Sequence, residues 1–523
     1  MILTKGLLHA SSNHPNELAL IENDHRYNYK ELEIRTAKLK DSLKTLGVQK
    51  GDRVALLMLN DFRYVELMYA VTALGAIVVP LNIRFSVTEN IYALNDAGAE
   101  VLFTHTEFLP ALAVLKEQIP VIKHYVLAED KDSSAFSEYP GLLSYEELLE
   151  KEPVEILDYN GVEEDDVAGI FYTGGTTGRS KGVMLTHKNL QMTTFHVLMN
   201  LNYEKDDIYL HSGPMFHLAD QASTFAVTLK GATHAILRMF TPKGTLEVIE
   251  KEKVTMSMLV PTMINMFLHS ADFDKYDTTS LRTILYGGSP IPVDLLKLVK
   301  EQMPQTQLAQ AYGMTESAAI LTLLKPENHI VNGTEIEEKR LVSCGQSVQT
   351  IELKIVDDAG NQLADNEIGE IIAKGPIIMK GYWNLPEETS KVFRDGWYYT
   401  GDLGYRDADG FYYIVDRAKD MIISGGENVY SVEVEQVLSS HPAVLECAVF
   451  GVPSEQWGEI VTAAVVLKGE MTATEEEIIS FIRDEISDFK LPKSVMFFDE
   501  LPKSGAGKIL KRLIREQYVE SGV

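Results

Sequence analysis

Helix-like and strand-like hydrophobic patterns alternate along most of this chain, and the alternation limits the folds open to it. Apolar residues within 29–46 recur at helical spacing and stop at Gly47, where a helix would end. A continuous apolar run over 54–59 is typical of a strand buried on both faces. Residues 86–89, Ser-Val-Thr-Glu, have the form of a capping box, and the next strand is expected at 100–104. This β-α-β rhythm predicts largely parallel, helix-covered sheets with ligands at the carboxyl ends of the strands.

The length of the chain, 523 residues, is too great for one hydrophobic core. After about residue 340, short β-branched runs separated by turns predict a β-rich subdomain that extends to residue 416. Residues 417–523 have an α+β pattern of their own. We therefore predict an α/β protein with an N-terminal domain over 1–416, which includes the β-rich subdomain at about 340–416, and a small α+β C-terminal domain over 417–523.

The segment 172–182 reads Tyr-Thr-Gly-Gly-Thr-Thr-Gly-Arg-Ser-Lys-Gly and is unsuited to a hydrophobic core. Its glycines let backbone N–H groups approach a ligand, its hydroxyls can donate hydrogen bonds, and Lys181 supplies positive charge. The composition indicates a polyphosphate cradle, with a Gly/Thr surface loop as the alternative. The segment is not a Walker loop, because two residues separate Gly178 from Lys181.

Charge and cysteine content disfavour several classes of protein. The 76 acidic residues outnumber the 48 lysines and arginines, and the formal net charge of −28 argues against nucleic acid or an anionic membrane as the main partner. Cations that bind phosphate must therefore be concentrated locally. Cys344 and Cys447 lack the spacing for a zinc or iron–sulfur site, cannot form a disulfide framework, and are expected to be buried and inert.

The sequence offers no signal for secretion or for a membrane span. The N-terminus lacks a basic start followed by a long apolar run. The most apolar window, 67–81, is too short to cross a bilayer and predicts instead a helix that runs into a buried strand. We therefore expect a cytoplasmic protein without a transmembrane segment.

Several further clusters are short, polar and often rich in glycine. They are 214–217 (Pro-Met-Phe-His), 287–292 (Gly-Gly-Ser-Pro-Ile-Pro), 312–316 (Tyr-Gly-Met-Thr-Glu), 399–402 (Tyr-Thr-Gly-Asp), 416–417 (Asp-Arg), 424–428 (Ser-Gly-Gly-Glu-Asn) and 502–508 (Pro-Lys-Ser-Gly-Ala-Gly-Lys). Each is weak alone: His217 suits a core or rim histidine, Asp402 a turn residue, and Lys508 a solvated charge. In this order, the set resembles the adenylate-forming superfamily of acyl-CoA synthetases, firefly luciferase and peptide-synthetase adenylation domains. The resemblance extends from about residue 10 to 515.

The resemblance implies a mobile C-terminal domain that rotates about a hinge, and two half-reactions. A carboxylate attacks the α-phosphate of Mg-ATP to give acyl-AMP and pyrophosphate, and a thiol then attacks the acyl-AMP to give a thioester and AMP. ATP and CoA are the implied co-substrates, Mg²⁺ accompanies the nucleotide, and no tightly bound organic cofactor is implied.

The resemblance also assigns roles to individual residues. The ATP- and AMP-binding set comprises the phosphate cradle (Thr173, Gly174, Gly175, Thr176, Thr177, Gly178 and Lys181), the loop beside adenine (Gly287, Gly288 and Ser289), the aromatic that stacks on adenine and its neighbour (Tyr312 and Gly313), and the ribose pair (Asp402 and Arg417). The catalytic set comprises Lys508, Thr315, Glu316 and His217, with Glu316 also as the magnesium ligand. Lys419 matches the hinge, and Gly425 and Gly426 match the pantetheine tunnel for CoA.

Elementary electrostatics agrees with these roles. A carboxylate and ATP repel each other, so Lys508 and Mg²⁺ are needed to neutralise the charge that grows on the five-coordinate phosphorus. One departure from the family pattern is Gly174, which stands where a serine hydroxyl is often present. A lost hydrogen bond of about 0.5–1.5 kcal/mol predicts a modest effect on ATP affinity.

The acid is less well defined than the reaction. Amino-acid-activating relatives carry an aspartate where this chain has His217, so a substrate ammonium would lack its counter-ion. An apolar channel could be lined by Met192, Phe195, Met199, Met215, Phe216 and the run 256–266, although the same residues could simply pack the core. A medium- or long-chain fatty acid is the first expectation, and an aromatic acid is the second.

Three hypotheses about the acceptor and the activity remain. Free CoA is favoured as the thiol because no carrier-protein domain is appended to the chain. An acyl-AMP ligase that loads a separate carrier protein is the second hypothesis. A non-catalytic nucleotide-binding module is the third, and the presence of Lys508, Glu316 and Asp402 argues against it. A homodimer is compatible with the sequence.

Overall fold

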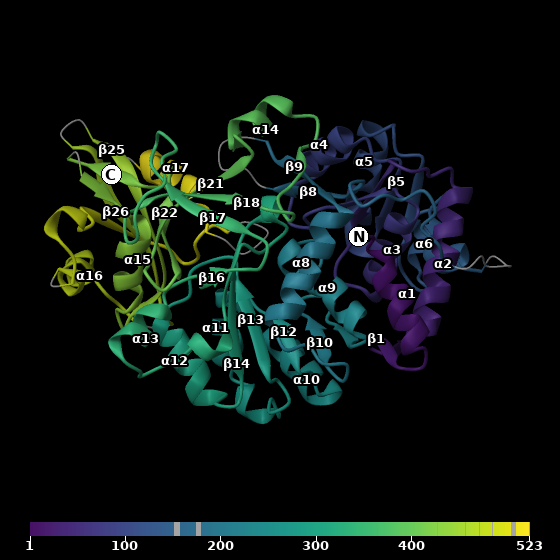
Figure 1. Ribbon diagram of the computed structural model, residues 1–523, viewed down its shortest axis with the longest axis horizontal. Helices are drawn as coiled ribbons and strands as arrows, with labels where there is room; N and C mark the ends of the chain where they lie inside the picture. Colours follow the sequence, from purple (N-terminus) through teal and green to yellow (C-terminus); the bar gives the residue numbers. More distant parts are fainter. Residues whose placement is uncertain are drawn as a thin grey trace.

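The computed structural model describes residues 1–150, 157–173, 179–425, 427–454, 457–469, 471–483, 485–503 and 509–521. Within these ranges the strands form four sheets, two of which are large and helix-covered. In Figure 1 the sheet with β5 and β8 lies at the right, the sheet with β12–β14 at the lower centre, the β-rich part with β17 and β18 above it, and a smaller C-terminal unit at the left. The predicted α/β class is confirmed.

The first large sheet holds nine strands among the described residues, in the order β16-β15-β14-β13-β12-β10-β11-β1-β2. The run from β14 to β1 is parallel, whereas β2, β15 and β16 are antiparallel additions at the two edges. The strands span Leu18–Glu22 (β1), His25–Asn28 (β2), Ile208–His211 (β10), Thr233–Ile236 (β11), Met256–Met258 (β12), Thr283–Gly287 (β13), Gln307–Tyr312 (β14), Thr322–Leu324 (β15) and Gln346–Ser347 (β16).

The second large sheet holds eight described strands in the order β19-β9-β8-β4-β3-β5-β6-β7. Its run from β8 to β7 is parallel, and β9 and β19 extend it in antiparallel fashion. The strands span Arg53–Leu57 (β3), Ile77–Pro80 (β4), Val101–Thr104 (β5), His124–Leu127 (β6), Leu143–Ser144 (β7), Val167–Thr173 (β8), Lys181–Thr186 (β9) and Gly381–Tyr382 (β19).

The helices of this region form three layers around the two sheets. Strand β3 shows why: Val54 and Leu56 belong to a core shared by both sheets, whereas Ala55 and Leu57 point to a separate core on the opposite face. The shared core includes side chains of α1 (Thr4–Asn13), α2 (Tyr29–Thr45), α3 (Phe62–Ala73), α8 (His187–Asn200) and α9 (Leu218–Lys230). The outer face of the second sheet is covered by α4 (Val87–Ala97) and α5 (Leu112–Gln118), and that of the first by α10 (Pro242–Glu252), α11 (Pro261–Leu268) and α12 (Val293–Gln302). The short helices are α6 (Ala135–Glu138), α7 (Tyr145–Leu148), α13 (Glu335–Arg340) and α14 (Pro386–Val392).

Local sequence signals agree with these elements. Ser86 and Glu89 form the expected capping box at the start of α4. The most apolar window becomes α3, all of whose residues are buried, followed by the buried strand β4. Among the described helices, none combines the length and the apolar character needed to cross a bilayer. Cys344 is buried as expected, Cys447 is half-buried, and both are free thiols.

The β-rich part and the C-terminal unit are built on smaller sheets. The first has the order β17-β18-β21-β20 with β22 beside β21, and the second has the order β24-β23-β26-β25 with β27 beside β26. The elements span Glu352–Val356 (β17), Gly369–Lys374 (β18), Phe393–Arg394 (β20), Trp397–Arg406 (β21), Tyr412–Arg417 (β22), Ile422–Ser424 (β23), Glu427–Val429 (β24), Ser431–Ser439 (α15), Val444–Ser454 (β25), Gly458–Leu467 (β26), Glu475–Ile482 (α16), Ser494–Phe497 (β27) and Lys511–Ser521 (α17).

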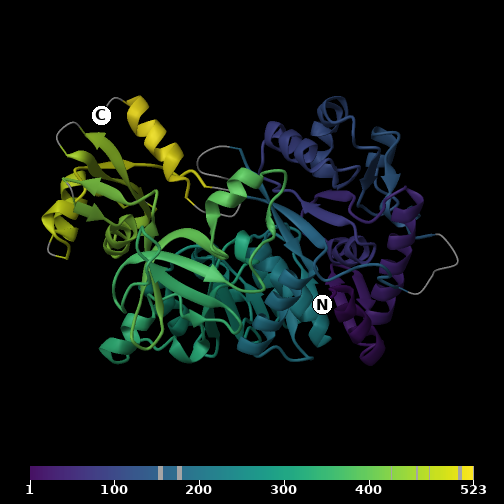
Figure 2. The same ribbon diagram turned by 45° about the horizontal axis from the view of Figure 1, so that its top comes forward.

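The C-terminal unit has its own hydrophobic cores. Helices α15 and α16 pack on one face of its sheet, and α17 packs on the other. Figure 2 shows this unit, drawn in olive and yellow, as a lobe beside the β-rich part. The chain passes from one sheet to the other between Arg417 and Ile422. The domain boundary at residues 416–417 lies beside this crossing and stays a prediction.

Candidate active site

Three of the predicted nucleotide-binding residues are the last residues of strands in the two large sheets. Thr173 ends β8, Gly287 ends β13 and Tyr312 ends β14. All three strands belong to parallel runs, and the carboxyl ends of such strands are the usual place for ligands.

The two ends of the predicted phosphate cradle are held together by a pair of strands. Thr173 of β8 lies opposite Lys181 of β9 in the antiparallel register. The cradle residues between them, Gly174, Gly175, Thr176, Thr177 and Gly178, lie outside the described part of the chain. Lys181 Nζ lies 2.5 Å from Oε2 of Glu388 on α14 and 5.0 Å from the centre of the Tyr382 ring. The cation of the predicted cradle is therefore engaged by a carboxylate and an aromatic face.

Tyr382 joins the cradle to the 312–316 motif. Its hydroxyl donates a 3.0 Å hydrogen bond to Oε1 of Glu316, while strand β19, which contains Tyr382, pairs with β9. Burial and the Glu316 carboxylate raise the pKa of Tyr382 well above its usual value, so its hydroxyl remains a donor. The N–H of Met379 also donates to the Glu316 carbonyl at 2.8 Å. These bonds fix Glu316, and with it the adjacent Thr315, relative to Lys181.

The predicted ribose pair is assembled on neighbouring strands. Asp402 of β21 and Arg417 of β22 are cross-strand partners, and Arg417 Nε lies 3.3 Å from Oδ1 of Asp402. The hydroxyl of Tyr312 donates to the other carboxylate oxygen, Oδ2, at 2.8 Å. Burial and Asp402 raise the pKa of Tyr312 well above its usual value. Three predicted nucleotide contacts are thus brought together.

Gly287 and Gly313 lie so close to neighbouring backbone that a side chain would not fit at either position. A Cβ on Gly287 would lie 2.4 Å from the carbonyl oxygen of Ala311, and one on Gly313 would lie 2.3 Å from that of Ala319. Gly288 has a φ of +83°, in the left-handed region that favours glycine. Ser289, which follows it, is half-buried.

His217 directly precedes α9 and is the N-cap of that helix. Its Nδ1 accepts a 3.3 Å hydrogen bond from the N–H of Ala219, and its ring meets the ring of Phe216 edge-on. A neutral ring that accepts at Nδ1 carries its proton on Nε2, which is then a hydrogen-bond donor.

The residues suggested for an apolar channel have mixed environments. Met215, Phe216, Met256 and Met258 are buried in the core shared by the two sheets, and Met192 packs against that core. Met263 is buried in the core of α10–α12. Phe195 is half-buried, whereas Met199 and Met266 have more than half of their surface exposed, at 54% and 53%. For most of the buried residues of this set, the structure supports a role in core packing.

The C-terminal candidates are only partly described. Lys508 and Gly426 lie outside the described residues. Gly425 has a φ of +61°, and a Cβ there would lie 3.0 Å from the ring of Trp457. Burial, with Arg417 nearby, lowers the pKa of Lys419. The hinge and tunnel roles of these residues remain predictions.

A buried charge cluster that sequence reasoning missed lies at the crossing between the β-rich sheet and the C-terminal unit. Asp416 of β22 accepts hydrogen bonds from Ser431, the first residue of α15, through its N–H at 2.5 Å and its hydroxyl at 3.1 Å. Lys511, the first residue of α17, lies 2.5 Å from the Ser431 hydroxyl and 2.8 Å from Glu435. Since Asp416 belongs to the β-rich sheet and the other three to the C-terminal unit, the cluster bridges the crossing. Asp416 belongs to the 416–417 motif, but no short motif marks Ser431, Glu435 or Lys511.

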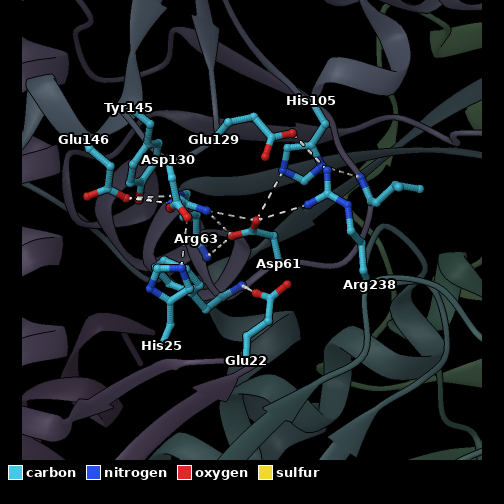
Figure 3. A network of polar contacts seen from close by, with 12 residues as sticks. Glu22, His25, Asp61, Arg63, His105, Glu129, Asp130, Tyr145, Glu146 and Arg238 are labelled. Carbon is cyan, nitrogen blue, oxygen red and sulfur yellow. Dashed lines mark hydrogen bonds and ion pairs between the residues drawn. The ribbon is translucent and has the colours of Figure 1, made fainter. Parts of the chain in front are cut away.

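A second polar cluster lies where the two large sheets meet, near the start of α3 (Figure 3). Asp61 lies 3.1 Å from Arg63, 3.4 Å from His105 and 3.7 Å from Arg238. Beside it, Glu22 of β1 accepts a 2.8 Å hydrogen bond from the N–H of Phe62. Burial and the Asp61 charge raise the pKa of Glu22 to about 8. These contacts tie β1 to the loops that follow β3, β5 and β11.

This second cluster includes three possible metal ligands, His105, Glu107 and Glu129, whose donor atoms all lie within 4.8 Å of one another. Arg238 forms ion pairs of 2.9 Å with both glutamates. The N–H of Leu59 donates to Nδ1 of His105 at 3.1 Å. Arg238 and the Leu59 N–H therefore already engage all three residues, and we assign no metal to them.

Comparison with known families and proteins agrees with the geometry. Residues 7–383 match the family model described as AMP-binding enzyme, and residues 433–508 match the AMP-binding enzyme C-terminal domain. The chain is 38% identical over 495 residues to a feruloyl-CoA synthase of Amycolatopsis sp, with 94% of each chain covered. It is 35% identical over 525 residues to the medium/long-chain-fatty-acid–CoA ligase FadD8 of Mycobacterium tuberculosis, covering 98% of this chain and 90% of the relative.

Solved structures are similar over almost the whole length. The o-succinylbenzoate-CoA synthetase MenE of Bacillus subtilis, in complex with ATP and magnesium, matches with a TM-score of 0.82 and 31% identity over 97% of this chain and 98% of its own. The anthranilate-CoA ligase AuaEII with anthranoyl-AMP matches with a TM-score of 0.89 and 27% identity over 100% and 98%. The chain therefore belongs to the AMP-binding enzyme family, as an acid–thiol ligase of the adenylate-forming acyl-CoA synthetase type.

Proposed function

We propose that this enzyme converts a medium- or long-chain fatty acid, ATP and CoA into acyl-CoA, AMP and pyrophosphate by way of an acyl-AMP. One structural observation supports the nucleotide step most directly. A series of contacts runs from Lys181 through Tyr382 to Glu316, and beside it Tyr312 and Asp402 form the ribose side of the same region. In this proposal, Lys181 serves as the cation for the β- and γ-phosphates and Asp402 as the acceptor for the ribose, and the contacts support both roles.

The residues present fit the roles that ATP activation needs. Asp402 is an acceptor-only group suited to two neighbouring ribose hydroxyls, and Arg417 and Tyr312 orient it. Glu316 offers a second carboxylate oxygen beyond the one that Tyr382 engages, which suits a hard cation such as Mg²⁺. A bound Mg²⁺ would supply positive charge at the phosphates. Lys508 bridges the substrate carboxylate and the α-phosphate in this proposal.

The acid is the finer part of the proposal. The likeness to FadD8 supports a fatty acid, and the likeness to the feruloyl-CoA synthase supports an aromatic acid as the second candidate. His217 in place of an aspartate argues against an amino acid. CoA is the proposed acceptor, and a carrier protein is the alternative. A cytoplasmic location and a homodimer stay predictions.

Pyrophosphate release measured over a panel of acids tests the proposal. Octanoate, palmitate, ferulate, 2-succinylbenzoate and anthranilate are supplied singly with Mg-ATP, first without and then with CoA. The highest kcat/KM for octanoate or palmitate, with thioester formed only when CoA is added, supports the proposal. A clear preference for ferulate replaces the fatty acid by the aromatic candidate. Acyl-AMP that free CoA does not discharge points to a carrier protein, and no release with any acid contradicts the proposed activity.

A further inference from the structure

Resting on the proposed function, we propose that Glu388 is a built-in competitor for the polyphosphate of ATP. Its carboxylate forms an ion pair with the ammonium of Lys181. When ATP binds, the phosphates take over that ammonium against the charge of Glu388. Glu388 therefore weakens the binding of both ATP and pyrophosphate, and it favours departure of the latter.

The pairing of Glu388 with Lys181 is set by the backbone. Helix α14, which contains Glu388, is joined to β19 by Thr389, whose hydroxyl accepts a 2.9 Å hydrogen bond from the N–H of Tyr382. Strand β19 pairs with β9. In this pairing, Tyr382 of β19 lies opposite Val183 of β9, which is two residues after Lys181. The carboxylate is thus held over the start of β9, where the predicted phosphate cradle ends. Two side chains that are 207 positions apart in the sequence meet at 2.5 Å.

The charge state of Glu388 suits a competitor. Its second oxygen, Oε1, accepts a hydrogen bond from Lys391, so one carboxylate bridges two ammonium groups. These lysines lower the pKa of Glu388 to about 2, and the group is ionised throughout the working pH range. The side chains of Lys181 and Glu388 are both 29% exposed. A pair this open to water contributes little to folding and can exchange one partner for another.

The chemistry of the ligands predicts which of them are affected. ATP and pyrophosphate bring several negative oxygens to Lys181, and each is repelled by a carboxylate that shares the same ammonium. AMP has neither a β- nor a γ-phosphate, so its binding should not depend on Glu388. Removing one opposing charge near the protein surface should strengthen binding about three- to tenfold.

Binding measurements without turnover test this inference. Titration calorimetry gives the Kd of ATP, pyrophosphate and AMP for wild type, Glu388→Gln and the matched control Glu387→Gln, in the absence of acid and CoA. Glu387 is the exposed neighbour of Glu388 on the same helix. We expect Glu388→Gln to bind ATP and pyrophosphate about three- to tenfold more tightly, with AMP unchanged. Glu387→Gln should match wild type with all three ligands.

A double variant assigns the effect to Lys181. In a Lys181→Gln background the competitor has lost its partner, so adding Glu388→Gln should no longer produce the tighter binding seen in wild type. Four outcomes overturn the inference: unchanged ATP affinity in Glu388→Gln, weaker ATP affinity, equal tightening for AMP, or the same tightening in Glu387→Gln. Wild type that binds neither ATP nor AMP contradicts the proposed function instead, so the two failures are distinguishable.

Discussion

Tyr312 donates a 2.8 Å hydrogen bond from its hydroxyl to Oδ2 of Asp402. The two residues are 90 positions apart, and they come from a strand of a large sheet and a strand of the β-rich part. Since Arg417 lies against the other oxygen of Asp402, the carboxylate is oriented from both sides. The proposed aromatic contact with adenine and the proposed contact with ribose are therefore mechanically coupled.

Tyr312→Phe tests this coupling because it keeps the ring and removes only the hydroxyl. Asp402 loses one of its two orienting partners, and a net loss of about 0.5–1.5 kcal/mol corresponds to AMP binding that is roughly two- to twelvefold weaker. The Kd of AMP is the measurement. Tyr405→Phe is the control, since Tyr405 lies on the same strand as Asp402 but stacks on Tyr413. An unchanged Kd in Tyr312→Phe would show that Arg417 alone orients Asp402.

Lys508→Ala should separate the two half-reactions. In the proposed role, the lysine neutralises charge where the substrate carboxylate meets the α-phosphate, so pyrophosphate release should fall by about 10²–10³-fold. Thioester formation from supplied acyl-AMP should change far less, because that phosphorus chemistry is already complete. Lys493→Ala, at an exposed lysine of the same C-terminal unit, is the control. An equal loss in both half-reactions would contradict the assigned role.

Asp416→Ala should loosen the crossing between the β-rich part and the C-terminal unit. The first turn of α15 loses the side chain that accepts the Ser431 N–H and hydroxyl, and Lys511 loses a nearby negative charge. Lost helix-capping interactions are worth about 0.5–2 kcal/mol, so the free energy of unfolding should fall by a similar amount. Trypsin should also cleave faster after Arg417 or Lys419. The control is Asp358→Ala, at an exposed turn residue, which should change neither the free energy of unfolding nor the rate of cleavage. Slow cleavage in Asp416→Ala would show that other contacts hold the crossing.

Glu22→Gln should change how stability depends on pH. Burial and Asp61 raise the pKa of Glu22 from 4.5 to about 8, so the folded chain holds this proton more tightly than the unfolded chain. The resulting stabilisation is complete below the unfolded pKa and is lost as the pH rises through the folded pKa. Arg63 and Arg238 face the same group and oppose the shift. Wild type should therefore lose stability between about pH 4.5 and pH 8 in urea unfolding, and Glu22→Gln should lose less. The control is Glu117→Gln, at an exposed position, which should behave as wild type. Parallel curves of stability against pH for all three proteins would contradict the raised pKa of Glu22.

The individual elements could be predicted because their signals are local. The capping box at Ser86 and the apolar run of β3 depend on neighbouring residues only, and both are confirmed. The facing arrangement of two sheets and their antiparallel edge strands could not be predicted. Strand β19, for example, pairs with β9, although strands β10 to β16 of the first sheet lie between them in the sequence. No short pattern specifies that register.

The candidate site shows the same division. Tyr312, Asp402 and Arg417 are marked by short motifs, and the structure brings them together. Tyr382 and Glu388 carry no motif, because their importance lies in partners that are 66 and 207 residues away. A helical glutamate with a lysine three positions later looks like an ordinary solvated pair in sequence. Only the fold shows that its other oxygen meets Lys181.

The two native thiols are poor nucleophiles, and that has a practical consequence. Burial raises the pKa of Cys344 to about 12 and that of Cys447 further, and each Sγ donates to a carbonyl oxygen. Maleimide reagents attack thiolates, so at neutral pH they should react first with a cysteine placed on the surface. The natural chain can therefore carry a dye on each side of residues 417–421 without prior removal of its cysteines. Energy transfer between such dyes would test whether the C-terminal lobe changes its angle during turnover.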